Sequence, residues 1–139
     1  MLTNDQEATL YREIIEKIEL PESAYMKAKE RYESLGTWLE KSECAKYSPH
    51  IFPQGSFRLG TAIRPLNDNN EYDLDLSCEL RKGILKSTHT QCELKEMVGR
   101  EIKAYRNANG VKAPVKEKHR CWRLEYADEL SFHMDIVPC

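Results

Sequence analysis

A chain of 139 residues has room for one domain built around one hydrophobic core. Its residues are 40 % hydrophobic and 32 % charged, which is typical of a globular protein and argues against intrinsic disorder. The longest apolar runs fall far short of the roughly 20 residues that a membrane helix needs, and the acidic N-terminus lacks the apolar segment of a signal peptide. We therefore expect a cytoplasmic protein without a membrane partner.

The net charge of −2 conceals an uneven distribution of charge along the chain. Residues 81–123 contain twelve Lys and Arg but four Asp and Glu, a local charge of +8, and the other stretches together carry −10. An acidic site beside a basic segment suits an enzyme that binds a metal and a polyphosphate, because metals prefer carboxylates and phosphates attract cations. A basic helix that is simply exposed to solvent explains the pattern equally well, and no nucleic-acid partner is clearly indicated.

The chain is expected to begin with a kinked helical lead-in over residues 1–42. A Thr-x-x-Gln capping box at Thr3 predicts a first helix that ends near Ile18. Pro21 suits the first turn of a second helix, which runs to about Lys41 with apolar residues at helical spacing.

The rest of the chain is expected to form strands around one further helix. Alternating or continuous apolar residues predict the strands, and a period near 3.6 followed by an Asn-Gly C-cap predicts the helix. Together the elements indicate an α+β domain with helices packed on one face of a mixed sheet. The expected strands cover residues 50–53, 72–80, 111–115, 121–126 and 131–137, the helix covers residues 91–107, and turns are expected at 67–70 and 127–130.

Three aspartates carry the candidate chemistry. Residues two apart in a strand face the same way, so Asp73 and Asp75 are expected to share one face while their apolar neighbours point into the core. Asp135 takes the equivalent outward position in the last strand, and His133 is expected on the same side. If the two strands are neighbours, three carboxylates meet. Like charges about 4 Å apart repel by several kcal/mol, and a divalent cation would relieve that repulsion.

Carboxylate oxygens favour Mg²⁺, with Mn²⁺ as a substitute. Two such cations would support nucleotidyl transfer: one lowers the pKa of an attacking hydroxyl, and the other holds a triphosphate and stabilises the leaving pyrophosphate. A turn just before these strands adds candidate nucleotide contacts. Gly55 allows close approach of the backbone to a phosphate, Ser56 adds a hydroxyl donor, and Arg58 is a candidate further phosphate contact.

Three segments closely resemble the bacterial cGAS/DncV-like nucleotidyltransferases (CD-NTases) of the polymerase-β-like superfamily: residues 52–65, 72–76 and 132–138. The helical lead-in is similar to the spine helix of that family. The resemblance implies a polymerase-β-like nucleotidyltransferase fold. It places the family's Gln-Gly-Ser turn on Gln54, Gly55 and Ser56, which are therefore expected to bind the nucleotide. The two paired metal-binding acids of the family fall on Asp73 and Asp75, and its third acid falls on Asp135.

The resemblance also implies an activity: condensation of nucleoside triphosphates such as ATP or GTP into a cyclic oligonucleotide, with release of pyrophosphate, as a signal in anti-phage defence. It implies that residues 1–139 are the catalytic domain of a longer enzyme, because family members continue into a helical domain. Uncovered apolar surface would then favour self-association. The nucleobases, ring size and linkage are expected to depend on residues after Cys139, and the activity of the chain by itself stays open, as does a regulatory partner.

Two other functions remain alternatives. A minimal nucleotidyltransferase that transfers AMP to a protein partner would use the same acids, although the long helical lead-in argues against it. An inactive fragment that only binds nucleotide would keep the fold, although all three acids are present as aspartate. The five cysteines are expected to be reduced thiols, and a zinc site built from His89, Cys92, His119 and Cys121 is a weaker reading of the pattern.

Overall fold

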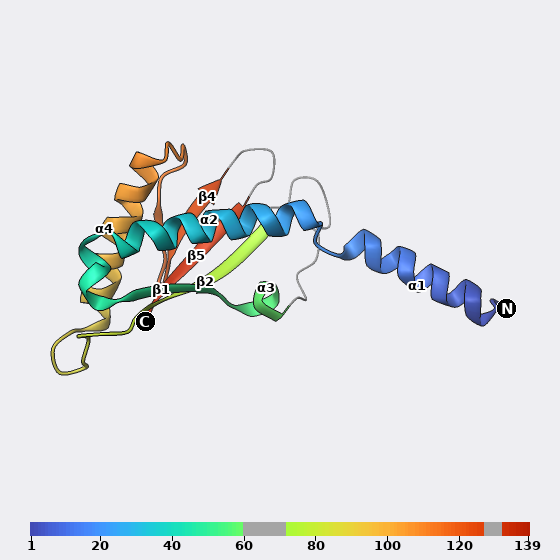
Figure 1. Ribbon diagram of the computed structural model, residues 1–139, viewed down its shortest axis with the longest axis horizontal. Coiled ribbons are helices and arrows are strands. Elements are labelled where there is room, and N and C mark those ends of the chain that lie inside the picture. Colours follow the sequence, from blue (N-terminus) through green and yellow to red (C-terminus); the bar gives the residue numbers. More distant parts are fainter. Residues whose placement is uncertain (60–71, 127–131) are drawn as a thin grey trace.

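The computed structural model describes residues 1–59, 72–126 and 132–139 and is centred on a five-stranded mixed sheet (Figure 1). Its α+β architecture confirms the fold class expected from the sequence. In chain order the elements are α1 (Asn4–Ile18), α2 (Glu22–Glu40), a 3-10 helix η1 (Glu43–Tyr47), β1 (Pro49–Pro53), α3 (Gly55–Leu59), β2 (Tyr72–Leu80), α4 (Gln91–Ala108), β3 (Lys116–Glu117), β4 (Trp122–Tyr126) and β5 (Phe132–Pro138).

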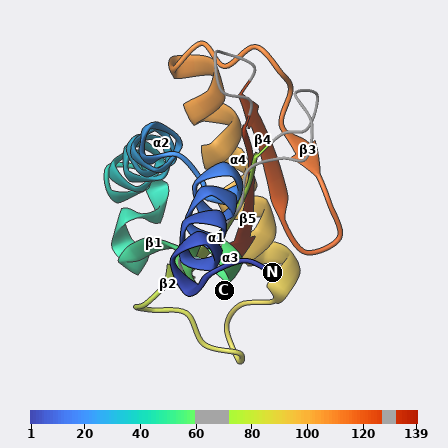
Figure 2. The ribbon, with the colours of Figure 1, turned by 90° about the vertical axis from the view of Figure 1, so that its right-hand side faces the viewer.

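The strand order β1-β2-β5-β4-β3 brings the two aspartate-bearing strands together at the centre of the sheet. β2 and β5 pair in parallel, whereas the other neighbouring strands are antiparallel. Figure 2 shows α2 and α4 on one side of the sheet, and buried residues of both helices share one core with the strands. The strand residues in that core are Leu74, Leu76, Cys78, Leu80, Trp122, Leu124, Phe132, Met134 and Ile136.

The two helices of the lead-in form where the sequence predicts them. The Thr3 side chain accepts from the backbone N–H of Gln6, whose side chain accepts from Thr3 in return, so the capping box is confirmed. Glu19 and Pro21 are extended, which separates α1 from α2 and makes Pro21 the N-cap rather than a member of the first turn. α1 buries none of its residues and projects away from the sheet (Figure 1).

The strand expected over residues 111–115 is wrong. Arg106, near the end of α4, donates from Nε to the carbonyl of Ala113 at 2.7 Å and from Nη2 to that of Lys112 at 2.8 Å. The carbonyl groups of Lys112 and Ala113 therefore accept hydrogen bonds from a helix side chain instead of from a neighbouring strand. Pro114 also lacks the N–H group that strand pairing would need. Pairing with β4 begins later, in the short β3.

α4 lies so close to β4 that no side chain fits between them at one point. A Cβ added to Gly99 would lie 2.3 Å from the ring of Trp122, whose indole N–H donates to the carbonyl of Lys95 at 2.8 Å. Helix α4 therefore packs in direct contact with the core-facing side of β4, opposite the face that carries Arg123 and Glu125.

Among the described helices, none is long and apolar enough to cross a bilayer. The turns expected at 67–70 and 127–130 lie outside the described residues.

Candidate active site

The aspartates occupy the face of the sheet opposite the helices. Asp75 and Asp135 are direct register partners across the parallel strands β2 and β5, and Asp73 is the partner of His133. The residues between them, Leu74 and Met134 among others, are buried in the core. The predicted alternation is therefore observed, and Asp73, Asp75 and Asp135 lie on one face of the two neighbouring strands, as predicted.

The turn between β1 and α3 is fixed against β2. The backbone N–H of Gln54 donates to the carbonyl of Asp75 at 2.7 Å, and its side-chain amide donates to the hydroxyl of Ser77. Gly55 follows with φ +62°, and a Cβ at that position would lie 3.4 Å from Oδ2 of Asp75. The glycine therefore brings backbone right up to the carboxylate, in a conformation that disfavours other residues.

The two other residues of the expected nucleotide contacts lie in the short helix α3. Ser56 is exposed in its first turn, beside Gly55. Arg58 is also exposed, and its guanidinium lies 5.7 Å from the centre of the Phe52 ring. Ser56 thus directly follows the glycine that lies close to Asp75, and Arg58 packs against Phe52 of β1.

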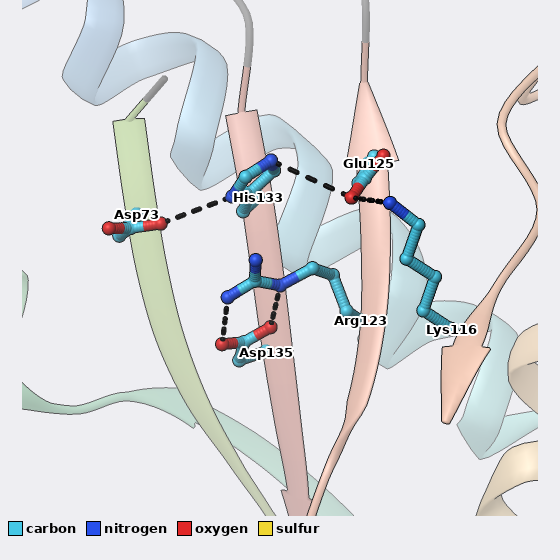
Figure 3. A network of polar contacts seen from close by, with 6 residues as sticks. All are labelled: Asp73, Lys116, Arg123, Glu125, His133 and Asp135. Atoms are coloured by element: carbon cyan, nitrogen blue, oxygen red, sulfur yellow. Dashed lines mark hydrogen bonds and ion pairs between the residues drawn. The ribbon is translucent and has the colours of Figure 1, made fainter. Parts of the chain in front are cut away.

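Two site residues that the sequence analysis missed come from β4. Figure 3 shows Arg123 reaching from β4 to Asp135, where it donates from Nε to Oδ1 at 2.7 Å and from Nη2 to Oδ2 at 2.8 Å. Glu125 lies 3.7 Å from Nε2 of His133, and Nδ1 of His133 lies 3.3 Å from Oδ1 of Asp73. The alternation of β4 contained the signal, because Trp122 and Leu124 face the core and leave Arg123 and Glu125 on the side of the aspartates.

The surroundings shift the pKa values of Asp75 and Asp135 in opposite directions. Burial, followed by repulsion from Asp135 and Asp73, raises the pKa of Asp75 above its ordinary value, and Arg123 only partly offsets this. Burial alone would also raise the pKa of Asp135, but the hydrogen bonds and the charge of Arg123 lower it overall. The hydrogen bond to Asp135 raises the pKa of Arg123, so the pair is fully ionised at neutral pH. Hydrogen bonding by Lys116 lowers the pKa of Glu125.

The donor set fits a hard divalent cation. Three carboxylates share one face of adjacent strands. Burial raises the pKa of Asp75, and repulsion from Asp135 and Asp73 raises it further, so a cation beside these oxygens would be favoured. Within the described ranges, no group of three or more His, Cys, Asp and Glu side chains is already gathered around a common point. Asp135 is instead bound to Arg123 and Asp73 is paired with His133. The four residues of the zinc alternative are not gathered either, and all five cysteines are free thiols.

Comparison with known proteins relates this chain to one family. The profile of the family described as "Cyclic GMP-AMP synthase DncV-like, nucleotidyltransferase domain" matches residues 49–138. The chain is 29 % identical over 128 residues to the cyclic dinucleotide synthase CdnG of Bradyrhizobium diazoefficiens, which covers 91 % of this chain and 28 % of CdnG.

Two solved structures show the same fold. The structure of CdnG from Bradyrhizobium diazoefficiens in complex with GTP superposes with a TM-score of 0.66 at 28 % identity, over 88 % of this chain and 34 % of that one. The Vibrio cholerae cyclic AMP-GMP synthase DncV, in complex with the linear intermediate pppA(3′,5′)pG, superposes with a TM-score of 0.68 at 14 % identity, over 90 % of this chain and 47 % of that one. The 139 residues thus span less than half of each of these relatives.

Proposed function

Because the chain belongs to the DncV-like nucleotidyltransferase family, we propose that it is the catalytic domain of an enzyme that condenses nucleoside triphosphates into a cyclic oligonucleotide. The observation that carries the proposal is the register of Asp75 with Asp135, with Gly55 seated against the Asp75 carboxylate. Carboxylates and a close-approaching backbone serve the two needs of this chemistry, which are cation binding and triphosphate binding.

The reaction joins a ribose hydroxyl of one nucleotide to the α-phosphorus of another. A new O–P bond forms, the bond between the α- and β-phosphates breaks, the hydroxyl proton is released and pyrophosphate leaves. Asp73, Asp75 and Asp135 would hold Mg²⁺ or Mn²⁺, which supplies charge stabilisation and lowers the pKa of the attacking hydroxyl when bound. Gly55 and Ser56 would contact the triphosphate, and Arg58 is the candidate for a further phosphate contact.

Gln54 has a different role in this proposal from a direct nucleotide contact. Its backbone and side chain are both hydrogen-bonded to β2, at Asp75 and Ser77. It therefore supports nucleotide binding by holding Gly55 and Ser56 at a fixed distance from the aspartates.

The remaining parts of the proposal follow from the family. They comprise a product that signals in anti-phage defence, action in the cytoplasm, and a helical domain that completes the nucleotide pocket in a longer chain. The relatives CdnG and DncV are named as cyclic dinucleotide synthases, which favours a cyclic product over transfer of AMP to a protein.

The first experiment is a thermal-shift titration of the purified chain with ATP or GTP, with and without Mg²⁺. Ligand that binds only the native state stabilises it by about 2.7 kcal/mol at 100 times the dissociation constant. We expect a shift that requires both nucleotide and metal and that disappears in the double variant Asp73→Asn and Asp75→Asn. A shift of equal size in a folded double variant would contradict the proposal. Mass spectrometry after incubation with nucleotides then separates a free oligonucleotide from AMP attached to protein.

A further inference from the structure

Asp135 lies in a row of three residues that runs across three strands. Its register partner on β2 is Asp75, and its register partner on β4 is Arg123. Arg123 contacts both carboxylate oxygens of Asp135, at 2.7 and 2.8 Å (Figure 3). Two parallel hydrogen bonds of this kind fix the plane of a carboxylate as well as its position.

The contact is also better shielded from solvent than the contact between Asp73 and His133. The side chains of Arg123 and Asp135 are 19 % and 20 % exposed. Asp73 is 72 % exposed, and among the described residues its ion pair is with His133, at 3.3 Å. Shielded, bidentate ion pairs are held more firmly than exposed single ones. Asp135 is therefore held more firmly than Asp73.

We propose that Arg123 is a positioning residue for Asp135 and orients its carboxylate so that it shares a divalent cation with Asp75. This inference rests on the proposed function, in which the three aspartates bind the cation. A carboxylate has about four lone-pair positions and a bidentate arginine uses two of them, so Asp135 keeps acceptor capacity while bound to Arg123. Supporting hydrogen bonds of this kind commonly change metal affinity by about 10- to 100-fold.

Arg123 affects a bound cation in two opposite ways. Its positive charge repels the cation, whereas its hydrogen bonds orient the ligand that receives it. Lysine keeps the charge but cannot form the two parallel hydrogen bonds of a guanidinium. Arg123→Lys therefore isolates the orienting role, and Arg123→Gln removes charge and paired hydrogen bonds together.

The test measures Mn²⁺ binding to the purified chain without nucleotide, from the electron paramagnetic resonance signal of free Mn²⁺. We expect Arg123→Lys to weaken binding about 10-fold or more, with no further loss when it is added to Asp135→Asn, because the carboxylate it orients is then gone. Arg120→Lys is the matched control, since it makes the same exchange at an exposed position just before β4. It should bind Mn²⁺ like the unchanged chain. Circular dichroism checks that each variant is folded.

Equal affinity in Arg123→Lys and the unchanged chain would overturn the proposal, and so would an additional loss in the Asp135→Asn background. Tighter binding in both Arg123→Lys and Arg123→Gln would show that the guanidinium competes with the cation, which also overturns it. If the unchanged chain and Asp75→Asn bind Mn²⁺ equally, the cation site of the proposed function fails, and the positioning role fails with it. A loss in Asp75→Asn without a loss in either Arg123 variant leaves the proposed function standing and removes only this inference.

Discussion

Gly55 lies against the carboxylate of Asp75, so that a Cβ on the glycine would lie 3.4 Å from Oδ2. The glycine is held there by Gln54, whose backbone N–H donates to the carbonyl of the same aspartate at 2.7 Å. A turn after β1 and an acid on β2 thus form one local unit of the candidate site. Gly55 adopts φ +62°, a backbone conformation that strains residues with a side chain.

Gly55→Ala is expected to lower the free energy of unfolding by about 1–2 kcal/mol, because alanine is strained at positive φ. It should also weaken the joint response to nucleotide and Mg²⁺, because the added methyl group occupies the space beside Asp75. Gly110→Ala is the matched control: Gly110 has φ +65° with nothing within 4 Å of an added Cβ. Urea denaturation should show a similar loss in both variants, and thermal-shift titration a loss of ligand response in Gly55→Ala alone. Equal ligand responses would mean that the space beside Asp75 is not used.

The surroundings of two helical glycines predict opposite effects on stability when each is replaced by alanine. Gly99→Ala would place its methyl group 2.3 Å from the Trp122 ring, and such overpacking commonly costs about 1–3 kcal/mol. Gly36→Ala on α2 meets only the Cβ of Ile51, at 4.0 Å. Removal of a helical glycine there should stabilise the chain by up to about 1 kcal/mol. Urea denaturation measures both, and a stabilised Gly99→Ala would contradict the close contact between helix and strand.

Much of the site could be predicted because strands impose a period of two. The alternation of β2 and β5 places Asp73, Asp75 and Asp135 outward without knowledge of any neighbour. The partners Arg123 and Glu125 required the pairing of β4 with β5 as well, since their roles depend on which residue lies opposite each of them. The alternation of β4 is visible in the sequence, whereas the register of β4 with β5 comes from the structure.

The failure at residues 111–115 has a different origin. Valine and alternation favour a strand there, but a strand also needs a partner for its backbone groups. Arg106 provides hydrogen-bond donors for two of the carbonyls from the end of α4. That contact depends on where the helix ends in space, which the local sequence does not encode.

The exposed apolar side chains of α1 predict concentration-dependent self-association of this chain. Leu10, Tyr11, Ile14, Ile15 and Ile18 are each 45–65 % exposed, and α1 has no buried residue. Ile14→Glu with Ile18→Glu places charge on this surface and should shift light scattering after size-exclusion chromatography toward the monomer. Glu13→Gln and Glu16→Gln on the same helix are the controls. A monomer at all concentrations in the unchanged chain would contradict the prediction.

Asp75→Asn is expected to raise the thermal stability of the chain when metal is removed with EDTA. Burial and the neighbouring aspartates raise the pKa of Asp75, so its charged form is less favourable in the folded state than in the unfolded one. The gain should not exceed about 1 kcal/mol, because solvent screens a partly exposed charge. The same substitution should abolish stabilisation by Mn²⁺. The Asp75 carboxylate of the unchanged chain would then lower stability in the absence of metal and raise it when Mn²⁺ is bound.

The pH dependence of that gain follows from the direction of the shift. For an acid whose pKa is raised by folding, protonation favours the folded state, so the folded chain recovers the lost stability as the pH falls through the raised pKa of Asp75. The advantage of Asp75→Asn should therefore be present at neutral pH and shrink in acid. Asp73→Asn is the comparison, because that side chain is 72 % exposed and contacts His133; it should show a smaller gain. Melting temperatures of the unchanged chain and both variants, measured in EDTA from neutral to acidic pH, test this prediction. An Asp75→Asn variant that is less stable than the unchanged chain at neutral pH would show that the Asp75 charge is already compensated without metal.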